Sequence, residues 1–123
     1  MSWSVTIPGQ PPSANHAYTI GKGYRKGGIS YPKIIKTEEA RAYQLGVAML
    51  VRTARPSGWA PQGQVVCEYR FYLWDEADCT NLIKVIEDGI FPALDINDSR
   101  ALPRAISKEI VPKSEARVEV TIT

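Results

Sequence analysis

Acidic side chains gather in one stretch of the chain, from Asp75 to Asp98, where seven carboxylates oppose the single base Lys84. Asp78 follows a predicted strand, and Asp98 lies in a predicted turn twenty residues later. Two carboxylates brought together repel each other unless a cation lies between them, so this pair is a candidate site for a hard metal ion. Magnesium suits such a site because it binds a few carboxylates together with waters and phosphate oxygens, and there it activates a water molecule.

The same residues also have ordinary structural interpretations. Acids are common at helix starts and in turns, so Asp78 can simply cap the helix that follows, and Asp98 can simply form a turn. Lys84 precedes Asp88 by four residues on the predicted helix, which is typical of a surface ion pair. In the functional interpretation, Lys84 contacts a scissile phosphate or orients the attacking water. The residues alone leave both interpretations open.

A basic segment precedes the acidic one. Eight basic residues lie between Gly21 and Arg55, and only Glu38 and Glu39 oppose them. This distribution favours a protein that holds a phosphate backbone and also binds a divalent metal, although a solvated surface of uneven charge is the alternative. We expect nucleic acid to contact four of the basic residues, which are Lys22, Arg25, Lys26 and Lys33.

Several other kinds of chemistry are not indicated. The single histidine, His16, lies in a polar stretch, and no glycine-rich phosphate-binding loop is present. Cys67 and Cys79 have no metal-binding spacing, and without a secretory signal they indicate reduced thiols in the cytoplasm. No apolar run has the length of a membrane span, so no membrane partner is expected. The length of 123 residues predicts one domain over residues 1–123.

The elements that must position these residues follow from the apolar periodicity. The sequence predicts an α+β fold, in which one mixed β-sheet packs with two main helices in a single small domain. Thr37 is a candidate N-cap for the first helix, which ends before Pro56. The second helix is expected from Thr80 or Asn81 to Ile90, with Gly89 and Pro92 weakening its far end. We expect a loop over 13–28 and strands over 3–7, 65–74, 102–111 and 116–123, whereas 29–36 is a strand or an extended arm.

Two stretches together resemble a known family. The first is Ser4-Val5-Thr6-Ile7-Pro8 followed by Pro11-Pro12-Ser13-Ala14-Asn15-His16-Ala17-Tyr18, which is similar to an opening strand and a P-P-S-x-N-x-x-Y turn. The second is Asp78-Cys79-Thr80-Asn81-Leu82-Ile83-Lys84-Val85-Ile86-Glu87-Asp88, which resembles a D-x-D-N-x-x-K-x-x-x-D run, followed by the turn Asn97-Asp98-Ser99. Both motifs, in this order, resemble the RusA family of Holliday junction resolvases over nearly the whole chain.

This resemblance implies a function and assigns roles to residues. The family consists of homodimeric, magnesium-dependent endodeoxyribonucleases that cut four-way junction DNA with paired nicks during recombination and repair. By position, Asp78 and Asp98 match metal-binding aspartates, and Lys84 matches the catalytic lysine. The resemblance also implies a RusA-like α+β fold and a nucleoid-associated, cytoplasmic protein of a bacterial chromosome, a phage or a prophage.

The chain departs from the family pattern at two positions. Thr80 stands where the family has its second aspartate, and Asn97 stands where it often has another acid. Three outcomes follow: Glu76 replaces the lost acid in a shifted register, Thr80 binds the metal through its hydroxyl or a water, or catalysis is lost. The last outcome leaves a non-catalytic, junction-binding module. A structural or regulatory protein that merely shares the fold is a further alternative.

Overall fold

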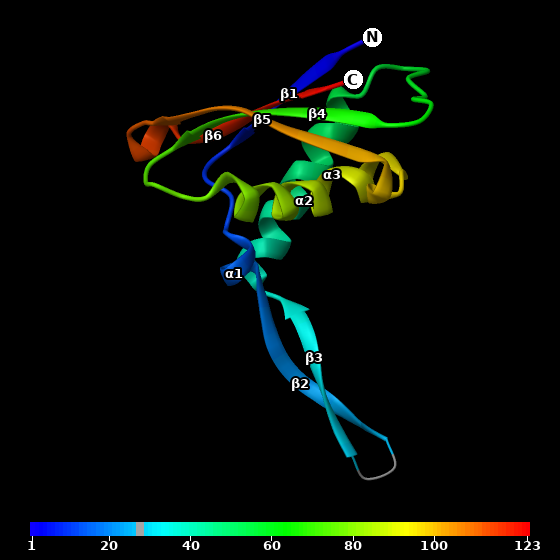
Figure 1. Cartoon of the computed structure of the whole chain (residues 1–123), viewed down its shortest axis with the longest axis vertical. Helices are drawn as coiled ribbons and strands as arrows, with labels where there is room; N and C mark the ends of the chain where they lie inside the picture. The colour runs from blue at the N-terminus through cyan, green and yellow to red at the C-terminus, as the bar shows by residue number, and fades with distance from the viewer. Residues whose placement is uncertain (27–28) are drawn as a thin grey trace.

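The computed structural model describes the backbone of residues 1–26 and 29–123 and the side chains of residues 1–19 and 35–123. Within those ranges the chain forms six strands, three helices and two short 3-10 turns (Figure 1). The strands are β1 (Trp3–Pro8), β2 (Tyr18–Lys26), β3 (Ile29–Lys36), β4 (Val65–Leu73), β5 (Ala101–Ile110) and β6 (Arg117–Ile122). The helices are α1 (Ala14–Ala17), α2 (Glu38–Ala54) and α3 (Cys79–Leu94), and the turns are η1 (Asp98–Arg100) and η2 (Lys113–Glu115).

Four strands form a mixed sheet in the order β1-β6-β4-β5. Strands β4 and β5 run parallel and are joined through α3, whereas β6 runs antiparallel to both β1 and β4. The predicted α+β class and mixed sheet are confirmed. The remaining two strands, β2 and β3, pair antiparallel in a separate hairpin that extends away from the body of the molecule (Figure 1).

The core lies between one face of this sheet and the helices α2 and α3. The predicted alternation of β4 is confirmed, because every second residue from Val65 to Leu73 is fully buried. The inward residues of β1 and β6 alternate in the same way, so the three strands present one continuous apolar face. The buried residues of α3 that pack with this face are Leu82, Ile86, Ile90, Phe91 and Leu94, whereas Val85 packs with Ala17 and Ala40.

Helix α2 begins and ends where the sequence predicts. The Thr37 hydroxyl accepts a hydrogen bond from the Ala40 amide at 3.2 Å, which satisfies one of the free N–H groups at the helix start. Glu38 and Glu39 occupy the first turn, where the helix dipole favours negative charge. The helix stops at Ala54, shortly before Pro56.

The prediction of a loop over 13–28 is wrong for most of that stretch. Residues 14–17 form the short helix α1, and residues 18–26 form β2. Pairing with β3 supplies the backbone hydrogen bonds of β2, so this strand forms without the apolar alternation of a core-facing strand. The backbone of residues 27–28 lies outside the described residues.

The predicted end of the second helix is also wrong. Helix α3 continues past Gly89 and Pro92 to Leu94, because Phe91 and Leu94 are buried in the core. The helix stops at Asp95, whose φ of 56° is left-handed and whose N–H bonds to the carbonyls of Phe91 and Pro92. In the part of the chain that the structure describes, no helix combines the length and apolar character needed to cross a bilayer.

Candidate active site

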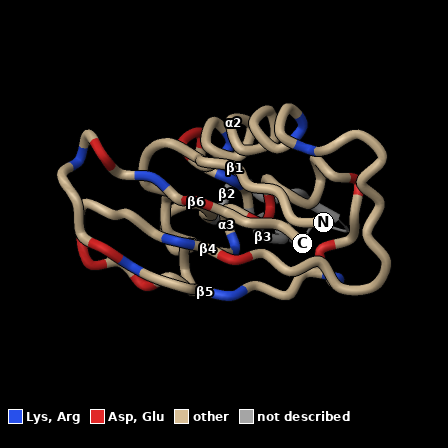
Figure 2. The backbone as a smooth tube through the Cα atoms, turned by 90° about the horizontal axis from the view of Figure 1, so that it is seen from above, with Lys and Arg blue, Asp and Glu red and all other residues tan. Residues whose placement is uncertain are grey.

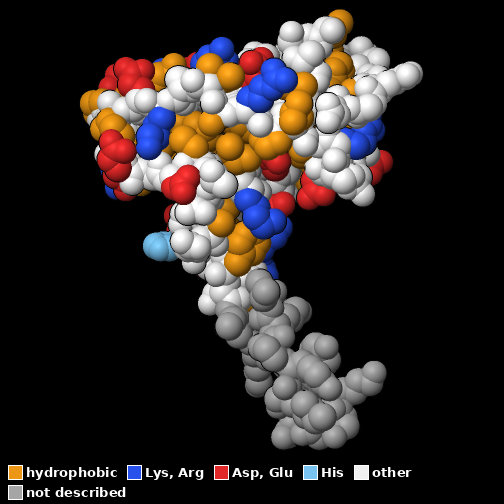
Figure 3. Space-filling model, viewed as in Figure 1, with side chains coloured by type: hydrophobic (Ala, Val, Ile, Leu, Met, Phe, Trp, Pro, Cys, Tyr) orange, Lys and Arg blue, Asp and Glu red, His pale blue; other side chains and the backbone are white. Residues whose placement is uncertain are grey.

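Helix α3 presents a polar stripe to one side of the molecule. Thr80, Lys84, Glu87 and Asp88 share this stripe, because residues three, four, seven and eight apart lie on one helical face. Together with Asp98 of η1, they line a cleft of about 450 Å³ that also touches β5. Figure 3 shows acidic and basic side chains side by side in this part of the surface, just above the base of the hairpin. The cleft therefore combines carboxylates with an ammonium group.

Lys84 forms the surface ion pair that its spacing predicts. Its Nζ lies 3.6 Å from the Asp88 carboxylate and 5.7 Å from the centre of the Tyr18 ring. The Tyr18 hydroxyl donates a hydrogen bond to the same carboxylate, so Asp88 joins the first residue of β2 to α3. Burial and this hydrogen bond raise the pKa of Tyr18 to about 12. Because 62% of the Lys84 side chain is exposed, its ammonium can still reach a ligand in the cleft.

Glu87 is a partly buried carboxyl group of the cleft, and its surroundings raise its pKa. Burial raises its pKa, and the nearby charges of Asp98 and Asp88 raise it further, whereas a hydrogen bond from Tyr69 lowers it. The Tyr69 hydroxyl donates this bond at 2.8 Å from beneath the helix. Burial in turn raises the pKa of Tyr69 well above its usual range. The hydrogen bond from Tyr69 therefore holds the Glu87 carboxyl group in place, and the negative charges of Asp98 and Asp88 act on it.

Asp78 and Glu76 lie in a different cleft, of about 360 Å³. Asp78 caps α3, because its carboxylate accepts the Thr80 amide at 3.0 Å. Glu76 lies 3.4 Å from the Nζ of Lys108. His16 and the Pro11-Pro12-Ser13 turn line the same cleft, so the two stretches that carry the family resemblance are adjacent in space. Of the predicted site residues, the fold thus groups Thr80, Lys84 and Asp98 in one cleft and Glu76 and Asp78 in another.

The donor set of the α3 cleft suits a hard cation only in part. Among the described residues, no three His, Cys, Asp or Glu side chains converge as a ready metal-binding group. Magnesium requires fewer protein ligands, because one or two carboxylates together with waters and substrate phosphates complete its shell. Glu87 and Asp98 both line this cleft, so they are the carboxylates from separate elements that are available there for such an ion.

The sequence assigned no role in the site to Glu87 or Asp88. Their spacing from Thr80 and Lys84 places them on the same helical face, and this spacing is the sequence signal that could have identified them.

The four basic residues expected to contact nucleic acid lie on the hairpin strands, with their side chains outside the described residues. They are Lys22, Arg25, Lys26 and Lys33.

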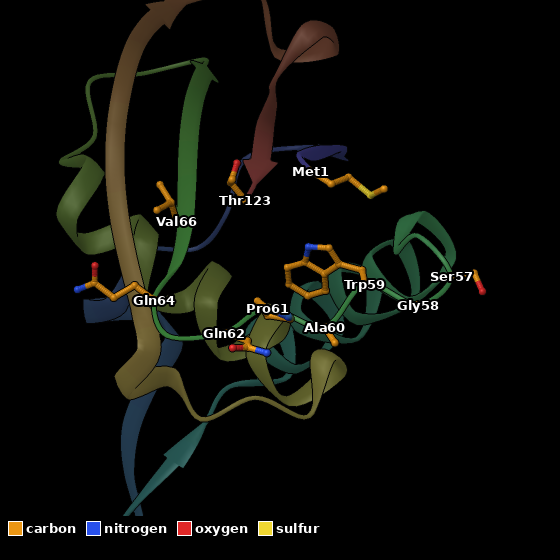
Figure 4. Close-up of a pocket in the computed structure, with 10 residues that line it drawn as sticks. All are labelled: Met1, Ser57, Gly58, Trp59, Ala60, Pro61, Gln62, Gln64, Val66 and Thr123. Atoms are coloured by element: carbon orange, nitrogen blue, oxygen red, sulfur yellow. The ribbon is translucent and has the colours of Figure 1, made fainter.

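A larger cavity, of about 510 Å³, lies beside the start of β4, next to Gln64 and Val66 (Figure 4). Its lining includes Trp59, Pro61 and Gln64 and has no acidic or basic side chain. The Trp59 ring packs edge-on against Trp3 at 5.3 Å between centroids, and the Arg55 guanidinium lies 5.4 Å from its centre. This cavity offers no acid–base or metal chemistry, so the α3 cleft is the better candidate site.

Comparison with known proteins adds no assignment. No protein-family model matches the chain, and no curated protein matches it. Membership of the RusA family therefore stays a prediction that depends on the two motifs.

Proposed function

We propose that this protein is a structure-selective endodeoxyribonuclease that resolves four-way DNA junctions by paired, magnesium-dependent phosphodiester hydrolysis. The observation that supports the proposal is the α3 cleft, where the carboxylates of Glu87, Asp88 and Asp98 lie beside the exposed ammonium of Lys84. Such a combination suits a phosphate ester held next to a hard cation. The activity would serve DNA recombination and repair.

Each residue of the cleft has a distinct role in this proposal. Asp98 and Glu87 would hold Mg²⁺, which supplies an activated water and neutralises charge on the phosphate when bound. Tyr69 keeps the Glu87 carboxylate in place through its hydrogen bond. The ammonium of Lys84 contacts the phosphate and favours the additional negative charge of the transition state. Asp88 restrains Lys84 through their ion pair.

The partners in this proposal are four-way junction DNA and a second copy of the chain. A homodimer provides two clefts, and two clefts account for paired nicks. The basic hairpin residues would contact the phosphate backbone, which supplies most of the salt-dependent affinity for DNA. The proposed location is the cytoplasm, in association with the nucleoid.

The first experiment measures cleavage of a labelled four-way junction and of a matching linear duplex, with and without magnesium. We expect symmetric nicks in the junction only, and only with magnesium. Asp98→Asn should lower the cleavage rate by roughly 100-fold while junction binding survives, because it removes a charge from the cleft. Asp95→Asn is the matched control, since Asp95 lies outside the cleft and asparagine tolerates its left-handed backbone. Equal cleavage by both variants would show that the site is wrongly assigned.

One observation favours a second candidate, a non-catalytic module that binds junctions. Asp78 serves as a helix cap outside the α3 cleft, and Thr80 contributes no charge to it. This candidate predicts tight, salt-sensitive junction binding without cleavage at any magnesium concentration. Cleavage gained by Thr80→Asp would then identify a decayed site.

A further inference from the structure

Arg100 joins the turn η1 to the loop over residues 55–64, which connects α2 to β4. This loop follows the end of the molecule where both chain termini lie (Figure 2). The Nε of Arg100 donates a hydrogen bond to the carbonyl oxygen of Gly63, and its Nη2 donates one to that of Pro61, both at 2.7 Å. Because a guanidinium group is planar and rigid, two such bonds fix its orientation as well as its position. Arg100 therefore ties η1 to the loop.

The loop itself is anchored, so it can serve as a support. The Trp59 ring is 8% exposed and packs edge-on against Trp3. The Arg55 guanidinium donates hydrogen bonds to the carbonyl oxygens of Trp59 and Leu94, at 3.0 Å and 3.2 Å. Leu94 is the last residue of α3. The connection from α3 to β5 is thus attached to the loop at both of its ends, through Arg55 and through Arg100.

Asp98 depends on this attachment for its place in the α3 cleft. It is the first residue of η1, a single 3-10 turn, and the hydrogen-bond geometry of such turns is poorer than that of an α-helix. Its side chain is exposed and forms no ion pair within the described part of the chain, so no opposite charge fixes its carboxylate. The Asn97 side chain caps the turn by accepting the Ser99 amide at 2.9 Å, and Arg100 ends it. The backbone of η1 therefore sets where the Asp98 carboxylate lies.

We propose that Arg100 is a positioning residue, which holds the Asp98 carboxylate in the geometry that a divalent cation requires by fixing η1 to the loop. Magnesium demands near-ideal octahedral geometry, so a carboxylate whose position is loosened binds it less well. Residues that orient metal ligands from behind typically contribute roughly 10- to 100-fold to metal affinity. A lysine at position 100 would keep the charge but lose the planar fork that binds two carbonyl oxygens. The inference rests on the proposed function, because it assumes that the α3 cleft holds the metal of a nuclease.

Binding of Mn²⁺ to the full chain without DNA tests this role. Carboxylate and water ligands suit Mn²⁺ as well as Mg²⁺, and electron paramagnetic resonance measures the free ion. Arg100→Lys should raise the Kd for Mn²⁺ by roughly tenfold, because it loosens η1. Arg104→Lys is the matched control, since Arg104 is an exposed arginine of β5 that does not line the cleft, and it should leave the Kd unchanged.

A double variant separates positioning from a general loss of stability. Asp98→Asn should raise the Kd as well, and adding Arg100→Lys to it should have little further effect, because the carboxylate that Arg100 positions is then already gone. Thermal unfolding of each variant is measured alongside. An Arg100→Lys protein that melts at a lower temperature but binds Mn²⁺ as tightly as the parent would show a merely structural role and overturn the proposal.

The same measurements distinguish failure of this inference from failure of the proposed function. If Asp98→Asn weakens Mn²⁺ binding and Arg100→Lys does not, the positioning role is wrong and the metal site stands. A parent that binds no Mn²⁺, or a Kd that neither substitution changes, would overturn both the positioning role and the metal site. If both substitutions weaken binding but the parent cuts no junction, the positioning role stands and the nuclease activity is wrong.

Discussion

At the scale of single residues, Glu87 makes stability depend on pH. Its pKa is higher in the folded protein than in the unfolded chain, chiefly because of burial. The folded state therefore keeps this proton to a higher pH than the unfolded state does. The resulting contribution to stability is present below the ordinary pKa of glutamate and is lost as the pH rises through the raised value.

We therefore expect Glu87→Gln to be more stable than the parent at neutral pH, with a difference that shrinks towards pH 4. The glutamine amide oxygen can still accept the Tyr69 hydrogen bond, so that contact is kept. Urea unfolding at several pH values measures the effect, and Glu109→Gln on the exposed strand β5 is the control. A stability difference that is constant over this pH range would contradict the assignment.

Tyr18 and Tyr43 allow a comparison of two Tyr→Phe variants, because only the Tyr18 hydroxyl has a hydrogen-bond partner among the described residues. Tyr18→Phe removes the hydroxyl that donates to Asp88 and should lower the free energy of unfolding by about 1 to 2 kcal/mol. Tyr43→Phe removes a buried hydroxyl that has no partner among the described residues, so it should be nearly neutral or stabilising. Thermal and urea unfolding give both values. Equal losses in the two variants would show that the Tyr18 hydroxyl makes no special contribution.

At the scale of elements, α2 and α3 approach each other closely at Gly89. A Cβ atom there would lie 3.0 Å from both Cβ and Cγ1 of Val47 and 3.2 Å from the carbonyl oxygen of Gln44. Gly89→Ala should therefore destabilise the protein by roughly 1 to 3 kcal/mol, despite the better helix propensity of alanine. Gly46→Ala should instead stabilise it by roughly 0.5 to 1 kcal/mol, because nothing lies within 4 Å of its Cβ position. Urea unfolding of the two variants should thus show shifts of opposite sign.

Elements with a strong local signal were predictable from the sequence, whereas β2 and the end of α3 were not. The alternation of β4 and the cap at Thr37 are local signals that tertiary packing reinforces. Strand β2 lacks such a signal, because its partner is β3 rather than the core. Pro92 suggested an early helix end, but burial of Phe91 and Leu94 outweighs the hydrogen bond that proline cannot donate.

The site shows the same division. The spacing of Thr80, Lys84 and Asp88 places them on one helical face, so this part of the cleft could be predicted from the sequence. The grouping of Asp98 with Glu87 depends on how η1 returns beside α3, and no local pattern encodes that path. Asp78 precedes the first turn of α3, and its capping bond keeps it in another cleft.

At the scale of the whole molecule, the hairpin extends beyond the body (Figure 1), and it carries the basic residues that we propose to contact DNA. The combined variant Lys22→Ala, Arg25→Ala and Lys26→Ala should weaken junction binding. It should also reduce the slope of log K against log salt by about 0.9 for each lost phosphate contact. Fluorescence anisotropy at several salt concentrations measures the slope. Lys113→Ala, in η2 on the body, is the control. An unchanged slope in the triple variant would show that these three basic residues are exposed to solvent without contacting DNA phosphates.

The pairing of β1 with β6 also governs the order in which the chain folds. Trp3 lies opposite Ile122, so this ladder joins the first strand in the sequence to the last. Closing so long a loop is entropically unfavourable, whereas β4, α3 and β5 are contiguous and can assemble early. Strand β1 should therefore join the sheet after the β4–α3–β5 unit has formed. We therefore expect folding to be slow for a domain of this size, because β1 and β6 are far apart in the sequence and must pair in a single register in the last step.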